Sequence, residues 1–487
     1  MKREGYLLLL IFIFFYETLS AQAVNKIQSK IHQLTQHHAF HHAVIGFSLL
    51  DAHTGNVISS NNKEVSLLPA STLKLITTAC AIDKLGEKSR FTTSLYYRGN
   101  LDNKGILNGD IIIKGGGDPA LGSSRFGKEN SPDAVLGSFL NIITAAGIKR
   151  ISGNIYADAS IFEEELVPPT WIWLDMGNYF GAGASGLTFN ENTYQLVFKP
   201  GKKVGDTATI LGTEPATGLT FKNNVTTSSA DTRDMAYITG AFYSSYRSVS
   251  GTIPAGRDEF RIKGSLSDPP QFVADEFKNR LQSVGILMDG ASYSTRIHKV
   301  ETGKWVKLDS LVSPTILEIV TQTNMKSVNL FAEHLLKQLG LKVNNNGSTN
   351  SGLKVIEKFL IDKTGNASGA YFADGSGLAL NNLISAHKMS EFLFKIKSEK
   401  WFESWLKTLP VAGNSGTVSG FCKGTTAEGK VWLKSGTMQR VKAYAGYVKG
   451  KGGNLYPFAI FVNNYFGVAG DINKQLENLM VEMAELP

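Results

Sequence analysis

Residues 69–85 place a serine and a lysine at the start of an expected helix. The segment Pro69-Ala70-Ser71-Thr72-Leu73-Lys74 is followed by a mainly apolar run from Leu75 to Leu85. Side chains three positions apart share one face of a helix, so the Ser71 hydroxyl and the Lys74 amine should lie within hydrogen-bonding reach. An amine that has lost its proton can take the hydroxyl proton and activate the serine as a nucleophile. The alternative is a serine that caps the helix and a lysine in solvent, and this pattern alone leaves both open.

The length of the chain predicts more than one domain. Its 487 residues exceed the size at which a single hydrophobic core stops growing, so we expect two or three domains. Hydrophobic residues make up 42% of the chain and charged residues 19%. These proportions are typical of a globular protein and argue against global disorder.

The first 23 residues have the pattern of a secretory signal peptide. Lys2 and Arg3 form a basic start, an apolar core runs from Tyr6 to Tyr16, and Ala21-Gln22-Ala23 is a small-residue cleavage site. No later stretch approaches the roughly 20 apolar residues that a membrane span needs. We therefore expect an exported protein without a stable membrane span after cleavage; an uncleaved N-terminal anchor is the alternative.

The net charge and the cysteine and histidine residues limit which binding partners and metal sites are expected. The net charge of +8 favours approach to anionic polymers, of which the cell wall is one. The basic residues are scattered and lack interleaved aromatic residues, so no nucleic-acid partner is expected. Two cysteines, Cys80 and Cys422, exclude a disulfide scaffold and leave a single bridge open. A histidine cluster lacks neighbouring cysteines or carboxylates and is expected to be solvated, at His37, His38, His41 and His42.

Hydrophobic periodicity predicts three regions that differ in their secondary structure. Helices and strands alternate early, and residues 190–265 are rich in Thr, Ser and Gly with short alternating segments, which predicts a separate all-β module. The last third alternates again and ends in a helix with a core-facing stripe at Ile472, Leu476, Leu479, Met483 and Leu486. The expected helices span 25–36, 131–146, 271–284, 314–323, 330–339 and 354–361; the expected strands span 43–50, 56–60, 96–98, 106–114, 151–158, 194–198, 260–262, 429–433, 443–448 and 458–463.

Two further short elements give the serine and lysine a context. Ser327-Val328-Asn329 precedes an expected helix, and Lys434-Ser435-Gly436-Thr437 ends an expected strand. Ser-x-x-Lys, a Ser-Asp-Asn element and Lys-Thr-Gly, in this order, are the joint signature of penicillin-binding proteins and serine β-lactamases. The ordered set favours catalysis over a chance match.

The residue types fit acyl transfer. Ser71 would attack an acyl carbon, and Lys74 would accept its proton and later return one to the leaving amine. Ser327 would relay protons between Lys74 and the leaving group. The amide of Asn329 would hold the substrate backbone.

The Lys434 segment would bind the substrate and its transition state. Lys434 offers a positive charge for a substrate carboxylate, Ser435 keeps a hydroxyl in the binding strand, and Gly436 lets the substrate approach the backbone. The backbone N–H groups of Ser71 and Thr437 are the natural pair of oxyanion-hole donors.

With these motifs the chain resembles the D-alanyl-D-alanine carboxypeptidase/endopeptidase family to which penicillin-binding protein 4 belongs. The gap of 256 positions between Ser71 and Ser327 is also similar to that family, whose transpeptidase-like domain is interrupted by two nested domains. Further matching segments are Leu68-Pro69-Ala70-Ser71, Gly115-Gly116-Gly117-Asp118-Pro119, Asp158-Ala159-Ser160-Ile161-Phe162, Asp374-Gly375-Ser376-Gly377-Leu378 and Leu409-Pro410-Val411-Ala412-Gly413.

The resemblance implies an α+β fold similar to that of penicillin-binding proteins and serine β-lactamases, with an antiparallel sheet and helices in the catalytic domain. We expect residues 24–92 and 305–487 to form that transpeptidase-like domain. Residues 93–185 and 270–304 would form an insert domain, and residues 186–269 a nested β-rich domain.

The resemblance also implies an activity. It implies a periplasmic serine peptidase that cleaves D-alanyl-D-alanine bonds in peptidoglycan stem peptides, and often D-alanyl cross-links, with penicillins acylating Ser71 and no metal or organic cofactor. Three residues match positions that help to receive the far amino end of a diaminopimelate side chain: Asp158, Phe162 and Gln439.

Three positions depart from the family pattern. Val328 occupies the middle of Ser-x-Asn, and Ser435 replaces the usual threonine but keeps a hydroxyl. Leu380 stands where the family often has an arginine, and it cannot bind a carboxylate. The sequence therefore leaves open which diamino acid is recognised, and whether carboxypeptidase or endopeptidase activity dominates.

Two other functions compete with the DD-peptidase. A serine β-lactamase would need fast deacylation, which no feature of the sequence indicates. A non-hydrolytic penicillin-binding sensor or wall-binding module would not require an activated nucleophile, so the intact Ser71 and Lys74 argue against it.

Overall fold

The computed structural model describes residues 22–300 and 303–487. Most of the predicted signal peptide, residues 1–21, therefore lies outside the described residues. The chain forms two compact units: the first comprises Met1–Lys84, Val320–Ser327 and Leu353–Pro487, and the second comprises Leu85–Ile319 and Val328–Gly352. The finer division into three domains, with a nested module at 186–269, stays a prediction.

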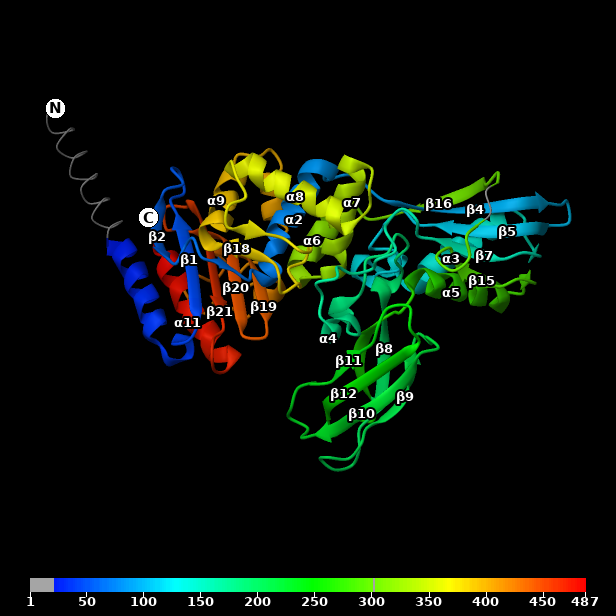
Figure 1. The fold of residues 1–487 in the computed structure, drawn as a ribbon, viewed down its shortest axis with the longest axis horizontal. Helices are drawn as coiled ribbons and strands as arrows, with labels where there is room; N and C mark the ends of the chain where they lie inside the picture. Colours follow the sequence, from blue (N-terminus) through cyan, green and yellow to red (C-terminus); the bar gives the residue numbers. More distant parts are fainter. Residues whose placement is uncertain (1–21, 301–302) are drawn as a thin grey trace. The chain divides into compact units, whose positions relative to one another are not determined.

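The first unit is built on an antiparallel sheet with the strand order β19-β20-β21-β1-β2 (Figure 1). Aromatic and β-branched residues, which favour strands, are frequent in its inner strands β20 and β21. These two strands are buried almost throughout, as expected for strands covered on both faces. The strands span Val431–Met438 (β19), Val441–Lys449 (β20), Leu455–Asn463 (β21), Val44–Leu50 (β1) and Val57–Asn61 (β2).

Helices cover both faces of this sheet. On one face, Phe47 and Leu49 share a core with a helix at residues 22–36 and with α11 (Ala469–Met483). On the other face, Ser48 accepts a hydrogen bond of 2.8 Å from Ser390 of α9 (Ala386–Ile396). Since alternate residues of a strand point to opposite faces, the sheet is the middle of three layers.

A buried helix, α2 (Lys74–Leu85), carries the predicted lysine of the first unit. Its residues from Lys74 to Ile82 are all buried, and Thr78 accepts a hydrogen bond of 3.1 Å from the indole of Trp405. The first unit also contains the 3₁₀ helix η2 (Ala70–Leu73), α10 (Phe402–Leu406) and a small sheet of β17 (Ala370–Tyr371), β18 (Leu383–Ser385) and β3 (Ser66–Leu67).

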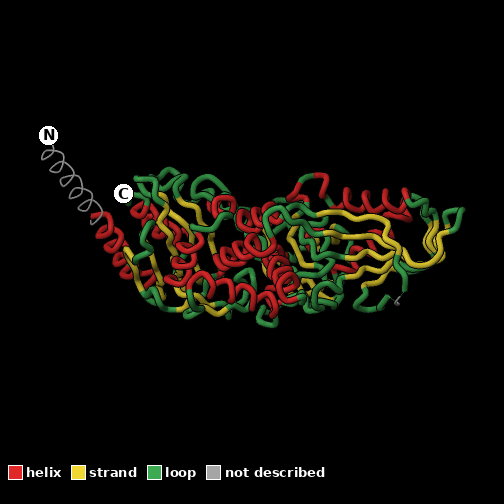
Figure 2. Tube along the Cα trace, turned by 90° about the horizontal axis from the view of Figure 1, so that it is seen from above, coloured by secondary structure: helices red, strands yellow, loops and turns green. Residues whose placement is uncertain are grey.

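The second unit contains a seven-stranded sheet and two three-stranded sheets. Helices α3 (Pro132–Ala145) and α5 (Pro269–Ser283) pack against the larger sheet, and the rings of Phe139 and Phe277 lie 5.5 Å apart. The larger sheet comprises β4 (Thr92–Leu101), β5 (Ile106–Lys114), β6 (Arg150–Ile151), β7 (Ile155–Asp158), β14 (Leu287–Met288), β15 (Ser292–Ser294) and β16 (Val306–Val312). Strands are yellow and helices red in Figure 2.

The two smaller sheets fall in the segment for which an all-β module is expected. One has the order β10-β12-β11 and the other β13-β8-β9. Their strands are β8 (Thr193–Lys199), β9 (Thr209–Glu214), β10 (Thr220–Ser228), β11 (Tyr237–Thr239), β12 (Tyr246–Pro254) and β13 (Phe260–Ser265). Three further helices follow in the chain, α6 (Ile316–Lys326), α7 (Asn329–Asn344) and α8 (Thr349–Thr364).

The expected α+β architecture is confirmed, with two local corrections. The expected strand at 151–158 is split at residues 152–154, where Asn154 donates its backbone N–H to the carboxylate of Asp110 at 2.8 Å. The Lys434-Ser435-Gly436-Thr437 segment lies inside β19 and does not end it, because pairing with β20 continues from Lys434 as far as Met438 and Val441.

The residues that raised metal and disulfide alternatives have ordinary surroundings. His38, His41 and His42 are exposed, and among the described residues no group of three or more His, Cys, Asp or Glu is placed to hold a metal ion. Cys80 and Cys422 are both buried and unbonded to each other. Within the described ranges, no helix is both long and apolar enough to cross a membrane.

The C-terminal helix α11 should contribute strongly to the stability of the first unit. Leu476 is fully buried in the core that α11 shares with the sheet, so Leu476→Ala should lower the free energy of unfolding by about 2–5 kcal/mol. The exposed Lys474 on the same helix provides a control, and Lys474→Ala should change stability by less than about 1 kcal/mol. Chemical denaturation followed by circular dichroism measures both. Equal midpoints for the two variants would contradict the packing of Leu476 in this core.

Candidate active site

Ser71 and Lys74 lie beside each other at the junction of η2 and α2. The Nζ of Lys74 donates a hydrogen bond of 3.0 Å to the Oγ of Ser71. Lys74 is fully buried, whereas Ser71 is partly exposed. Ala70, just before the serine, has a φ of 45°, a left-handed conformation that is strained for a residue with a Cβ. The turn therefore holds a partly accessible hydroxyl against a buried amine.

A tight loop places a carbonyl against the same amine. The Nζ of Lys74 donates a hydrogen bond of 2.6 Å to the backbone oxygen of Ser376. The buried carboxylate of Asp374 braces this loop by accepting hydrogen bonds from the N–H groups of Gly377 and Ala379 at 2.7 and 2.6 Å. The sequence indicated this segment only through family resemblance and assigned no role to Asp374 or Ser376.

Strand β19 runs along η2 and brings Lys434 into the site. Gly436 permits this approach, because a Cβ there would lie 2.8 Å from the oxygen of Pro69 and 3.0 Å from the nitrogen of Ser71. Lys434 is fully buried and donates a hydrogen bond of 2.7 Å to the oxygen of Ser435. Burial, together with the charge of Lys74, lowers the pKa of Lys434 well below its usual value.

The outer edge of β19 presents backbone donors. β19 is the last strand of its sheet, and Leu433 donates its N–H away from β20, to the oxygen of Pro410 at 3.0 Å. Since alternate residues of a strand direct their backbone groups to the same side, the N–H of Thr437 also faces the outer edge. This is the geometry that an oxyanion-hole donor on β19 requires.

The remaining predicted residues of this strand and its turn lie at the surface. The Oγ of Ser435 is 2.8 Å from the Oγ1 of Thr417. Thr437 is exposed and accepts a hydrogen bond of 3.0 Å from the Nζ of Lys442, a residue that the sequence did not indicate. Gln439 is exposed in the turn between β19 and β20. The exposed Leu380 follows the Asp374 loop.

Ser327 and Asn329 occupy the junction between α6 and α7. Ser327 has a φ of 57°, again a strained left-handed conformation, and belongs to the first unit together with Ser71, Lys74 and Lys434. Asn329 is the first residue of α7 and belongs to the second unit. There its Nδ2 donates a hydrogen bond of 2.8 Å to the oxygen of Phe180.

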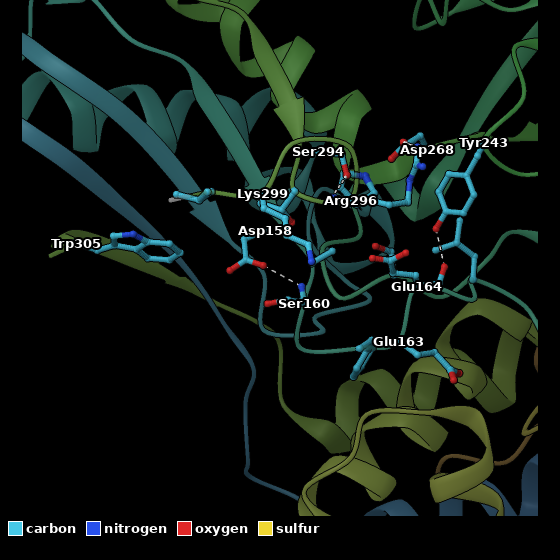
Figure 3. A pocket seen from close by; sticks show the side chains of 17 residues that line it. Asp158, Ser160, Glu163, Glu164, Tyr243, Asp268, Ser294, Arg296, Lys299 and Trp305 are labelled. Atoms are coloured by element: carbon cyan, nitrogen blue, oxygen red, sulfur yellow. Dashed lines mark hydrogen bonds and ion pairs between the residues drawn. The ribbon is translucent and has the colours of Figure 1, made fainter. Parts of the chain in front are cut away.

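The second unit holds a pocket of about 300 Å³ that is lined by Asp158 and Phe162, among other residues (Figure 3). Asp158 is 6% exposed and accepts a hydrogen bond of 2.9 Å from the N–H of Ser160. The ring of Phe162 packs edge-on against His334, 5.7 Å away. The pocket thus has a carboxylate and an aromatic ring in its lining, together with basic side chains.

One wall of this pocket was not indicated by the sequence. The guanidinium of Arg296 stacks 3.8 Å from the centre of the Tyr243 ring and pairs with Asp268 at 2.7 Å. Such a contact depends on the folded positions of residues far apart in the chain, and no short motif marks it.

The serine and buried amine beside an edge strand define a serine hydrolase of the penicillin-binding class. Residues 27–485 match the D-Ala-D-Ala carboxypeptidase 3 (S13) family, and the chain therefore belongs to this family of serine-type carboxypeptidases. The predicted family and enzyme class are confirmed.

Relatives match along most of their length. The chain is 28% identical to a D-alanyl-D-alanine carboxypeptidase of Actinomadura sp., with 92% of this chain and 83% of the relative covered. It is 24% identical to the D-alanyl-D-alanine carboxypeptidase DacB of Haemophilus influenzae, over 86% and 85% of the two chains. The crystal structure of penicillin-binding protein 4 from that organism shares the fold, with a TM-score of 0.77 at 21% identity over 94% of this chain and 97% of that one.

Gly377 should be essential for the shape of the turn at Ala70 and Ser71. Its φ is +81°, and a Cβ there would lie 1.9 Å from the oxygen of Ala70, so Gly377→Ala must displace the residue before Ser71. We expect acylation by a fluorescent penicillin to slow by about tenfold or more, since small misplacements of reacting groups are costly. Gly420→Ala is the matched control, because its Cβ would meet nothing within 4 Å. Equal acylation rates in the two variants would refute this role of the loop.

The buried amine of Lys434 should impose a pH dependence on stability. The pKa of Lys434 in the folded chain lies well below the ordinary 10.5. At pH values between the folded and the unfolded pKa, the unfolded chain therefore binds more protons than the folded chain. Stability therefore rises with pH through that window, and this contribution is absent from Lys434→Met. Between about pH 7 and about pH 9.5, the change in denaturation midpoint should therefore be more positive in the wild type than in Lys434→Met. Lys423 is exposed, so Lys423→Met should keep the wild-type dependence of the midpoint on pH. If Lys434→Met kept it as well, burial of the Lys434 amine would have no effect on stability.

Proposed function

We propose that this chain cleaves the D-alanyl-D-alanine bond of peptidoglycan stem peptides through an acyl-enzyme on Ser71. The contact of 3.0 Å between the Nζ of Lys74 and the Oγ of Ser71 carries the proposal. The donor pair on Ser71 and Thr437 would stabilise the oxyanion of the tetrahedral intermediate; one such donor is worth about 2.7–4 kcal/mol in other enzymes.

The proposed reaction has two steps. The Oγ of Ser71 bonds to the carbonyl carbon of the penultimate D-alanine as its proton passes to Lys74, and the terminal D-alanine leaves after its nitrogen takes up a proton relayed by Ser327. Water then attacks the ester carbon, which frees Ser71 and the shortened peptide.

Lys434 would bind the terminal carboxylate of the substrate. Burial disfavours the charged amine in the free enzyme, and an arriving carboxylate beside it favours protonation again. Ser435 and the amide of Asn329 would hold the substrate backbone. The amino end of the diamino acid side chain would be received by Asp158, Phe162 and Gln439.

We further propose that the protein works in the periplasm and is acylated by β-lactams. The basic and apolar N-terminal pattern supports export. A penicillin-binding protein 4 structure from Haemophilus influenzae, similar in fold to this chain with a TM-score of 0.74, was solved as a complex with a β-lactam.

Two assays on one set of variants test the nucleophile. The wild type should bind a fluorescent penicillin covalently and release D-alanine from a pentapeptide ending in D-Ala-D-Ala, whereas Ser71→Ala should lose both activities by at least about 10³-fold. The exposed Ser398→Ala should keep both. Equal labelling of Ser71→Ala and the wild type would exclude Ser71 as the nucleophile. Stable labelling without D-alanine release would favour a sensor, and fast loss of the label with penicillin turnover would favour a β-lactamase.

A further inference from the structure

The β-rich part of the second unit makes direct contact with the segment that holds Asn329. This segment runs from α4 (Trp173–Met176) to η5 (Tyr179–Gly181), and its Phe180 oxygen accepts the hydrogen bond of 2.8 Å from the Asn329 amide. η5 also packs against α7, which begins at Asn329, and against β13. One determinant of the position of the Asn329 side chain is therefore what holds residues 173–181.

One buried side chain, that of Asn178, fastens this segment to β11. Asn178 is 5% exposed, and its Nδ2 donates hydrogen bonds to the oxygens of Leu174 at 2.7 Å and Ile238 at 3.1 Å. Its Oδ1 accepts a hydrogen bond of 3.0 Å from the N–H of Ile238. Both amide protons and the amide oxygen are thus used, so no other rotamer of Asn178 satisfies the same groups.

The backbone on either side of Asn178 is tied down as well. Asn178 itself pairs with Gly264 of β13 as an isolated bridge, and Ser265 donates its N–H to the oxygen of Gly177 at 3.0 Å. Gly177 lies so close to β11 that a Cβ would come within 2.2 Å of the Ile238 oxygen. Gly181 donates its N–H to the oxygen of Asn178 at 3.0 Å, which closes the turn that presents Phe180.

We infer that the β-rich sheets of the second unit position the Asn329 amide, with Asn178 as the positioning residue that joins them. A continuous path of hydrogen bonds runs from Ile238 through Asn178 and the η5 turn to Phe180 and Asn329. The inference rests on the proposed role of Asn329 in holding the substrate backbone. It assigns to the β-rich insertion a function in catalysis that does not require the insertion to touch the substrate.

A double-mutant cycle tests the path. The second-order rate of acylation by a fluorescent penicillin is measured for the wild type, Asn178→Ala, Asn329→Ala and the double variant. Asn178→Ala should slow acylation by about 10- to 100-fold, the cost of a misplaced reacting or binding group. In the Asn329→Ala background, the same change should have almost no further effect, because residues that act through one another are not additive.

A matched control separates positioning from loss of stability. Asn223 of β10 also bonds two backbone groups of the same insertion, the oxygen of Ala208 at 2.6 Å and the N–H of Val225 at 3.0 Å, and neither bond reaches residues 173–181. Asn223→Ala should lower the thermal midpoint as Asn178→Ala does and keep the wild-type acylation rate. Asn178→Asp, which keeps the acceptor for Ile238, provides a second variant if the alanine variant does not fold, and it should also slow acylation.

The outcomes distinguish this inference from the proposed function. If Asn329→Ala acylates slowly but both Asn178 variants acylate at the wild-type rate, the inference is wrong and the proposed role of Asn329 stands. Multiplicative rate losses in the double variant would also overturn it. If Asn329→Ala acylates at the wild-type rate, the proposed role of Asn329 fails first, and the inference fails with it.

Discussion

The contact between the amine of Lys74 and the hydroxyl of Ser71 is the interaction around which the candidate active site is arranged. A buried amine is costly unless its hydrogen bonds are satisfied, and here the Ser376 oxygen supplies one of them at 2.6 Å. Asp374 holds that oxygen in place through two backbone N–H groups, and Gly377 lets the loop reach the turn before Ser71. The loop therefore holds both the amine of Lys74 and the turn before Ser71 in place.

A second buried lysine, Lys434, lies close enough to Lys74 for the charge of Lys74 to lower its pKa. Lys74 and Lys434 are both fully buried, and the charge of each disfavours charge on the other. A proton acceptor beside Ser71 must be neutral before attack, whereas a carboxylate receptor must be charged once substrate is bound. Two buried amines close to each other favour loss of a proton in the free enzyme, and a carboxylate bound as proposed would restore the charge.

The sequence predicted the parts of the site that lie in short motifs, and it missed those that depend on tertiary contacts. Ser71 and Lys74 are one helical turn apart, so local geometry alone places them together. The Ser376 oxygen has no side-chain signature, because any residue supplies a backbone carbonyl. Arg296 and Tyr243 meet only after the chain has folded, and Asn178 lies in an irregular segment without periodicity. The strand at 429–433 was predicted too short for a similar reason. The polar residues that follow it lack a strand-like pattern, and they belong to β19 because their backbone pairs with β20.

Helix α7, which begins at Asn329, has several buried polar side chains that bond backbone oxygens of the second unit. His334 contacts the oxygen of Ser185 at 3.0 Å, Lys337 donates to the oxygen of Glu165 at 2.6 Å, and Gln338 donates to the oxygen of Gly116 at 2.7 Å. Burial lowers the pKa of His334 to about 4, so this ring is neutral near pH 7. Apolar side chains would bury these positions at lower cost, but they would not fix the rotation of the helix about its axis. Directional bonds along one face do so, and here they hold the helix that begins at Asn329 in a fixed orientation within the second unit.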